Sequence, residues 1–247
     1  MVTVTRVAHS TVLIDFDGHH VLTDPWFSER FGYYHGEPYG IALKDLPRLD
    51  AVLVSHGHYD HYDLKAFAAY SDKSVPMLVK RGIGERARKA GFGDVREVDA
   101  WDATTIGPIT ITAAPGKHAV PEITFVLQGS GSTIYFGGDT MLIPQLEDVA
   151  ARFPRIDLAL LPINGLMLRP AFNRKIVMDA ADAGQACAIL RPRLAVPIHY
   201  AFKGGPIMDR LVLKYSGTPD EFRREAARLA PQTDVRILAP GEPVSIS

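Results

Sequence analysis

The feature of this 247-residue sequence that most constrains its fold is a histidine cluster directly after an apolar run. Ala51–Val54 is continuously apolar, which is typical of a strand buried on both faces. The segment SHGHYDH follows it at positions 55–61. Polar side chains at the end of a buried strand need partners, and a cation would supply them. The pattern therefore predicts a metal site where a buried strand ends.

The spacing within this segment indicates two neighbouring ions. Residues i and i+2 of an extended loop point the same way, so His56 and His58 can bind one ion. Asp60 and His61 stand at the turn into a helix and can face a second ion. Gly57 permits the tight backbone path between the first two ligands.

Two ions require further ligands at the ends of other strands on the same rim. His118 comes shortly after the expected strand 109–113, Asp139 after 133–136, and His199 after 194–197. Their shared placement after separate strands makes these three residues the expected additional ligands.

The remaining pattern predicts two blocks of strands, each accompanied by helices. Helices are expected over Asp63–Tyr70, Gly82–Ala90, Ile143–Arg152, Val177–Leu190 and Pro219–Leu229. Strands are expected over Val2–Val7, Thr11–Phe16, His19–Thr23, Ala51–Val54, Met77–Val79, Val95–Val98, Ala103–Ile106, Ile109–Ala113, Ile123–Leu127, Thr133–Phe136, Leu158–Leu161, Leu194–Pro197, Val235–Leu238 and Val244–Ile246. The stretch 24–48 has no clear periodicity and is expected to be an irregular loop, of a length that is usually functional or covers a site. Its aromatic part, residues 26–39, either walls the substrate pocket or packs over the core. No linker divides the chain, so residues 1–247 are expected to form one domain of two packed sheets covered by helices.

The order of these motifs resembles the metallo-β-lactamase-fold hydrolase superfamily. The resemblance implies an α/β fold, namely a four-layer αβ/βα sandwich of two mixed sheets flanked by helices, with metals at the rim. It also implies a division of the ligands. His56, His58 and His118 would hold the first metal, Asp60, His61 and His199 the second, and Asp139 would bridge both.

Flanking motifs narrow the resemblance to one branch. VAHSTVLI at positions 7–14 and TDPWFS at 23–28 resemble the branch of ascorbate-6-phosphate lactonases and N-acylphosphatidylethanolamine phospholipase D. His58 stands where flavodiiron oxygen reductases carry Glu, which argues against oxygen chemistry. Asp139 and the single cysteine, Cys187, argue against the secreted antibiotic-degrading branch.

Five imidazoles and two carboxylates suit Zn²⁺ best, and Mn²⁺ or Fe²⁺ is also compatible with them. A water shared by two such ions loses its proton near neutral pH, so a metal-bound hydroxide is the expected nucleophile. The surplus positive charge favours a small anionic ester, either a phosphorylated lactone or a phosphodiester. Asp60 could orient the hydroxide, and His9 of the early motif could line the pocket, which makes these two the expected catalytic residues.

Several other side chains carry open alternatives. Asp24 is either a partner of a ligating imidazole or a turn residue before Pro25. Lys203 and Arg169 are either anion-binding residues or solvated charges. One of Tyr59, Tyr62 and Tyr200 could donate a proton to a leaving group, whereas His19, His20 and His35 are expected to be structural or exposed.

Composition excludes other classes. Lys and Arg total 27 and Asp and Glu total 28, so the net charge of −1 offers no global field for nucleic acid or acidic membrane. No stretch of 18 apolar residues and no signal-peptide pattern is present, so a cytoplasmic protein with a small-molecule substrate is expected.

Two alternative functions remain open. A phosphodiesterase acting on lipid or nucleotide is one, and a non-catalytic metal-binding module is the other. A lipid substrate would favour an apolar surface near the metals, whereas a sugar phosphate needs a polar pocket with basic residues.

Overall fold

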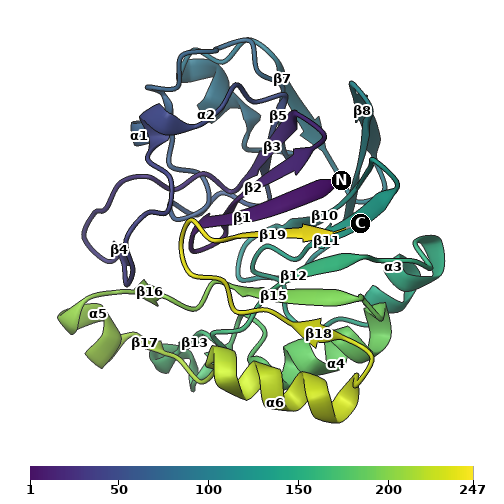
Figure 1. Ribbon diagram of the computed structural model, residues 1–247. Coiled ribbons are helices and arrows are strands. Elements are labelled where there is room, and N and C mark those ends of the chain that lie inside the picture. Colours follow the sequence, from purple (N-terminus) through teal and green to yellow (C-terminus); the bar gives the residue numbers. More distant parts are fainter. Residues whose placement is uncertain (247) are drawn as a thin grey trace.

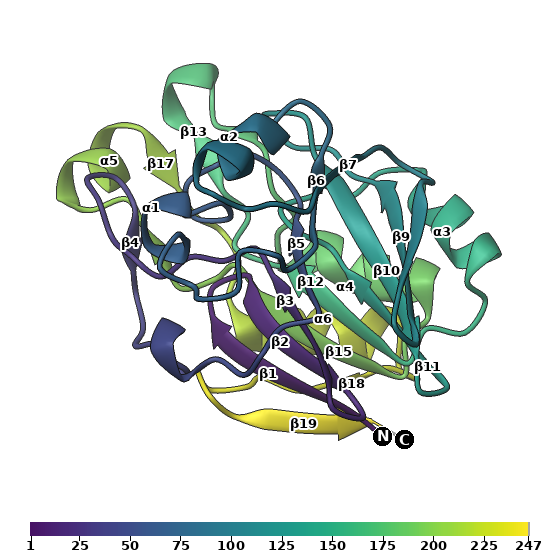
Figure 2. The same cartoon turned by 90° about the horizontal axis from the view of Figure 1, so that it is seen from above.

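The computed structural model describes residues 1–246, in which two seven-stranded mixed sheets lie face to face (Figures 1 and 2). The first sheet has the order β19-β1-β2-β3-β5-β6-β7. Its strands are β1 (Val2–Ala8), β2 (Thr11–Phe16), β3 (His19–Thr23), β5 (Ala51–Val54), β6 (Met77–Lys80), β7 (Val95–Val98) and β19 (Pro243–Ile246). The second has the order β18-β15-β12-β11-β10-β9-β8. Its strands are β8 (Ala103–Ile106), β9 (Ile109–Pro115), β10 (Ile123–Gly129), β11 (Ser132–Phe136), β12 (Leu158–Pro162), β15 (Leu194–Ile198) and β18 (Asp234–Val235).

Helices cover the outer face of each sheet and complete the four layers. The helices α1 (Leu64–Phe67) and α2 (Gly84–Lys89) lie on the first sheet, and α3 (Leu146–Arg152), α4 (Ala180–Leu190) and α6 (Pro219–Leu229) lie on the second. Buried aliphatic and aromatic side chains of both sheets, including Val4, Ile14, Phe125 and Leu160, form the core between them. The expected αβ/βα sandwich is therefore confirmed.

Short elements that the sequence pattern did not predict gather at one end of the sandwich. The two-residue strands are β4 (Tyr34–His35), β13 (Met167–Leu168), β14 (Arg174–Lys175), β16 (Phe202–Lys203) and β17 (Leu213–Lys214), and they are accompanied by helix α5 (Pro206–Leu211) and the 3-10 turns Leu43–Asp45 and Arg169–Ala171. Strands β14, β13 and β17 form one small sheet, and β16 pairs with β4.

The helix ends follow local capping chemistry. Helix α6 begins where expected, because Thr218 and Glu221 form a capping box around Pro219. Helix α4 begins at Ala180 rather than at Val177, because the extended residue Asp179 caps it through the backbone N–H of Asp182. The expected helix 63–70 shortens to 64–67, with residue 63 as its cap.

Strand direction brings the ends of six strands to one rim of the sandwich. In the first sheet β1 and β3 are both antiparallel to β2, and β5 is parallel to β3. In the second sheet β9 and β11 are both antiparallel to β10, and β12 and β15 continue parallel to β11. The loops that follow β1, β3, β5, β9, β11 and β15 therefore meet, although their sequence positions span almost two hundred residues. Among the described residues, no helix has the length and apolar character that a membrane crossing requires.

Candidate metal centre

The first cluster at this rim contains His56, His58, His118 and Asp139, whose donor atoms all lie within 4.8 Å of one another. Nδ1 of His58 is 3.0 Å from Nε2 of His56 and 3.1 Å from Nε2 of His118. Oδ2 of Asp139 lies 3.9 Å and 3.7 Å from the same two Nε2 atoms. The loops after β5, β9 and β11 thus bring three imidazoles and a carboxylate around one point.

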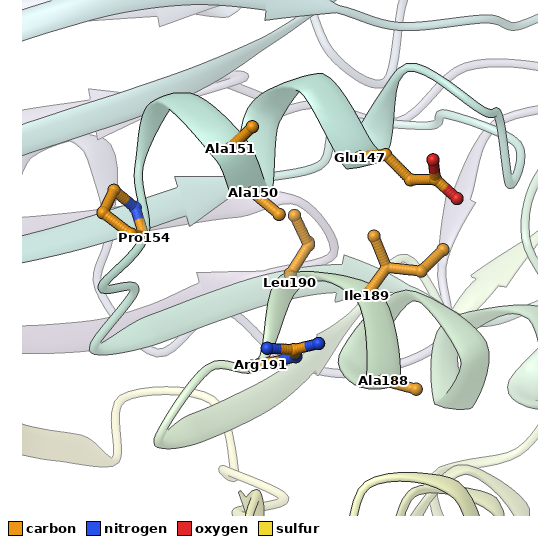
Figure 3. Close-up of a pocket in the computed structure, with 8 residues that line it drawn as sticks. All are labelled: Glu147, Ala150, Ala151, Pro154, Ala188, Ile189, Leu190 and Arg191. Carbon is orange, nitrogen blue, oxygen red and sulfur yellow. The ribbon is translucent and has the colours of Figure 1, made fainter.

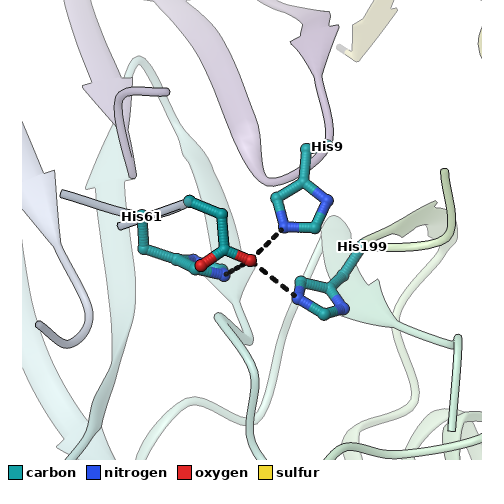
Figure 4. Close-up of side chains that lie close together, drawn as sticks. His9, His61 and His199 are labelled. Atoms are coloured by element: carbon teal, nitrogen blue, oxygen red, sulfur yellow. Dashed lines mark ion pairs between the residues drawn. The ribbon is translucent and has the colours of Figure 1, made fainter. Parts of the chain in front are cut away.

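The second cluster contains Asp60, His61, His199 and also His9. Oδ2 of Asp60 lies 3.3 Å from Nε2 of His9, 3.7 Å from that of His61 and 3.9 Å from that of His199 (Figure 4). The sequence pattern assigned His9 to the pocket wall, whereas its Nε2 atom lies within the donor group itself.

Asp139 lies between the two clusters. Its Oδ1 atom is 3.2 Å from Nε2 of His61, and its Oδ2 atom is 3.0 Å from Nε2 of His199. All seven side chains expected as ligands are therefore adjacent, with Asp139 in the position of a bridge.

Unsatisfied buried atoms support a cation at this place. Nε2 of His9, His61 and His199 and Oδ1 of Asp139 are buried, and none has a hydrogen-bond partner among the described residues. A buried polar atom without a partner is costly, and a divalent cation satisfies such nitrogen and carboxylate donors. The donor set thus fits metal ions.

Asp24, at the end of β3, orients two of the imidazoles. Its Oδ2 atom accepts hydrogen bonds from Nδ1 of His61 and from the hydroxyl of Ser55, both at 2.7 Å. The Ser55 oxygen in turn lies 2.9 Å from Nδ1 of His56. With Nδ1 carrying the proton in each ring, the Nε2 lone pairs face the cluster. Of the two readings of Asp24, the structure supports the partner of an imidazole.

Glu122 is a buried acid that the sequence analysis missed, although its position directly before the apolar run 123–127 is a visible signal. Its Oε1 atom accepts a hydrogen bond of 2.6 Å from the backbone N–H of Asp139 and lies 3.5 Å from Nδ1 of His56. Burial, reinforced by the negative charge of Asp139, raises the pKa of Glu122 well above its usual range. Glu122 therefore helps to fix the backbone at Asp139.

Protonation states at the centre also suit cation binding. Burial lowers the pKa of His9 to about 3 and that of His56 well below its usual range. Burial opposes the charge on Asp139, but His199 and His61 outweigh it and hold its pKa well below its usual range. Burial likewise opposes a proton on His61, but Asp139 and Asp60 outweigh it and raise the pKa of His61, so positive charge is favoured between these two carboxylates.

A cavity of about 180 Å³ opens onto both clusters. His58, Asp60, His118 and Asp139 form its floor, and no Lys or Arg lines it. Its walls are mostly apolar and come from the unpredicted short elements and the residues beside them: Tyr33, Leu166, Leu168, Ile176, Phe202, Met208 and Leu213.

The cavity changes which tyrosine is a candidate proton donor. Tyr59, Tyr62 and Tyr200 do not line it, whereas Tyr33 does. The hydroxyl of Tyr62 points instead to the carbonyl of Ile83, at 3.4 Å. The sequence offered no signal for Tyr33, because it lies in the irregular stretch between β3 and β4.

A second hollow, of about 470 Å³, lies between α3 and α4 (Figure 3). Its lining includes Ala150, Ala151, Ile189 and Leu190, and its only charged side chains are Glu147 and Arg191. None of the expected site residues lines this hollow, so the metal-facing cavity is the better candidate for chemistry.

Comparison with known proteins places the chain in a family. Residues 19–200 match a family described as the β-lactamase superfamily domain. A metal-dependent hydrolase of Anaeromyxobacter dehalogenans is 31% identical over 265 residues, covering 98% of this chain and 85% of the relative. An uncharacterized protein of Mycobacterium tuberculosis is 29% identical over 222 residues, covering 80% of this chain but only 58% of the relative. The structure of Igni18, a metallo hydrolase from Ignicoccus hospitalis, superposes with a TM-score of 0.77 at 22% identity, covering 100% of this chain and 98% of that one.

Proposed function

Since the chain belongs to the β-lactamase superfamily, we propose that it is a metal-dependent hydrolase with a two-cation centre. The observation that carries this proposal is the set of buried nitrogen and oxygen atoms around Asp139 that have no hydrogen-bond partner among the described residues. His56, His58 and His118 would hold one cation, and Asp60, His61 and His199 the other, with Asp139 between them. Zn²⁺ suits this nitrogen-rich set, and Mn²⁺ or Fe²⁺ is compatible with it.

When bound, the two cations would acidify a water and stabilise negative charge that develops on the substrate oxygen. Asp60 lines the cavity and lies beside His9, so its carboxylate is in position to orient the attacking water by accepting a hydrogen bond from it. Tyr33 lines the same cavity, and we propose that its hydroxyl gives a proton to the leaving group. The apolar walls exclude competing water from the reacting ester.

The lining of the cavity supports a substrate with an apolar group at the reacting end. Leu166, Ile176 and Met208 offer no charge to a phosphate or sugar. Of the expected substrates, an ester or phosphodiester with an apolar substituent therefore fits better than a phosphorylated sugar lactone bound wholly within this cavity.

The test combines metal content with turnover. The purified protein should bind two metal equivalents by elemental analysis and hydrolyse p-nitrophenyl butyrate or bis-p-nitrophenyl phosphate. His199→Ala should lose about one equivalent of metal and at least roughly 100-fold in kcat/KM, because it removes a proposed ligand of the second cation. His19→Ala, a half-exposed histidine far from the centre, should match the parent protein.

Two results would separate the alternatives. Two bound metals without turnover of either ester would favour a non-catalytic metal-binding module. Turnover that survives exhaustive chelation would refute a metal-dependent reaction.

A further inference from the structure

A groove of about 450 Å³, distinct from the hollow between α3 and α4, adjoins the metal-facing cavity. Phe202 of β16 and Leu213 of β17 line both hollows. Lys203 and Lys214, the residues next to them, line the groove but not the cavity. The two short strands thus contribute apolar side chains to the cavity over the metals and basic side chains to the adjoining groove.

Positive charge is in excess in this groove. Arg169, Lys203 and Lys214 line it and are exposed, and none of the three forms an ion pair within the part of the chain that the structure describes. Arg169 is held in place by neutral acceptors, since its Nε donates to the carbonyl of Leu213 at 2.9 Å. Its Nη2 atom donates to the backbone carbonyl of Asp209 at 3.4 Å.

The one acid of the groove is already engaged. Oδ1 of Asp209 accepts a hydrogen bond of 2.7 Å from the hydroxyl of Tyr215 and one of 2.9 Å from the backbone N–H of Gly204. Its carboxylate is therefore directed to neutral donors rather than to the cations. Three cations against one acid leave a surplus of two positive charges facing one hollow.

We propose that this groove binds the anionic end of the substrate, a carboxylate, sulfate or phosphate monoester, while the apolar body enters the metal-facing cavity. The hydrolytic part of this assignment rests on the proposed function, but binding of the anion does not. Positively charged side chains that surround a concave surface attract anions more strongly than isolated surface lysines. The arrangement accounts for an anionic substrate even though no basic residue lines the cavity over the metals.

The test compares hexane-1-sulfonate with 1-hexanol as ligands of the metal-loaded protein, by NMR or calorimetric titration at low salt. Sulfonates are weak metal ligands, so their charge reports on the groove. The sulfonate should bind about 10-fold more tightly than the alcohol, because exposed charge pairs contribute modestly and are screened by salt. The double variant Lys203→Ala/Lys214→Ala should lose about 10-fold in sulfonate affinity and keep its affinity for the alcohol.

The matched control is Lys44→Ala/Lys65→Ala, which removes the same charge from exposed lysines elsewhere and should behave like the parent protein. Equal sulfonate affinity in the groove variant and the parent would overturn the proposal. An equal loss for the sulfonate and the alcohol would also overturn it, because the lysines would then shape the cavity rather than bind charge. Metal content and ester turnover are measured separately, so failure of the hydrolase proposal would be recognised independently.

Discussion

The backbone N–H of His199 donates to the backbone carbonyl of His9, 3.4 Å away, and so joins the loops that follow β15 and β1. Both residues adopt the left-handed backbone conformation, with φ of 57° and 53°, which non-glycine residues rarely occupy. Such strain persists only where surrounding contacts enforce it. Glu37 supplies one such contact, because its Oε1 atom accepts a hydrogen bond of 3.1 Å from the backbone N–H of His9.

Replacing Glu37 should therefore destabilise the fold. Oε2 of Glu37 also accepts from Nη2 of Arg6 at 2.7 Å, and the Arg6 side chain is only 2% exposed. Glu37→Ala leaves that guanidinium buried without its partner, which costs about 3–5 kcal/mol, or a fall of roughly 6–20 °C in Tm. Differential scanning calorimetry measures this fall in Tm. Asp17→Asn, which removes an ion pair to the N-terminus with 61% of the Asp17 side chain exposed, should change Tm by less than about 2 °C. An equally small effect of Glu37→Ala would contradict the buried-pair argument.

Asp24→Asn should weaken binding of the second cation more than that of the first. Asp24 orients His61 directly and His56 through Ser55, and loss of such a partner typically reduces metal affinity about 10–100-fold. Competition with a chromogenic chelator measures the affinity of each site. The exposed Asp148→Asn variant serves as the control. An unchanged affinity at both sites would show that Asp24 does not orient the ligands.

Asp60→Asn should affect both metal binding and catalysis, because Asp60 lies in the donor group and also lines the cavity. The amide keeps one oxygen donor but lacks the negative charge that orients the attacking water, so activity should fall by about 100-fold or more, beyond any loss of metal. Activity is compared at saturating metal, with elemental analysis of the same sample. Full metal content together with full activity would refute a role for Asp60 in orienting the nucleophile.

Tyr33→Phe should affect only substrates whose leaving group needs a proton. The variant lacks the hydroxyl that would protonate the leaving group, so hydrolysis of an alkyl ester should slow by about 100-fold. A p-nitrophenyl ester has an acidic leaving group that needs no proton, so it should react at nearly the parental rate. Tyr59→Phe, which alters a tyrosine outside the cavity, is the matched control. An equal loss on both esters would indicate that Tyr33 shapes the cavity and gives no proton.

The bounds of strands with continuous apolar runs could be predicted closely from the sequence. The bounds of β5 agree to the residue, because all four of its side chains are buried and the run ends abruptly in polar residues. The same strands brought the expected ligand residues together, since each stands at the end of a strand directed to one rim. His118 and Asp139, for example, lie 3.7 Å apart through Nε2 and Oδ2, although 21 positions separate them in the sequence.

The walls of the cavity could not be predicted in this way. Strands β13, β16 and β17 contain two residues each, too few for periodicity to register. They form because tertiary contacts bring distant segments together, as when Phe202 pairs with His35 across β16 and β4. Substrate preference depends on these segments, which is why the sequence predicted the metal centre better than the pocket.

His35→Phe should make stability less dependent on pH. The ring of His35 stacks on Trp26 with a centroid distance of 3.5 Å, and both of its nitrogens are buried without a partner among the described residues. Burial lowers the pKa of His35 to about 4, below the value of 6.5 expected in the unfolded chain. Between these values the unfolded chain binds the extra proton, so the stability is complete above about pH 6.5 and is lost as the pH falls toward 4.

The loss attributable to His35 is on the order of 1–3 kcal/mol, allowing for its partial exposure. Phenylalanine keeps the stacking but cannot titrate, so the free energy of unfolding should fall less between pH 7.5 and 4.5 in His35→Phe than in the parent. Urea unfolding at the two pH values measures the difference, and acid effects on the metal ligands cancel because both proteins share them. If His35→Phe lost as much stability as the parent protein between the two pH values, His35 would not be a buried neutral residue in the folded protein.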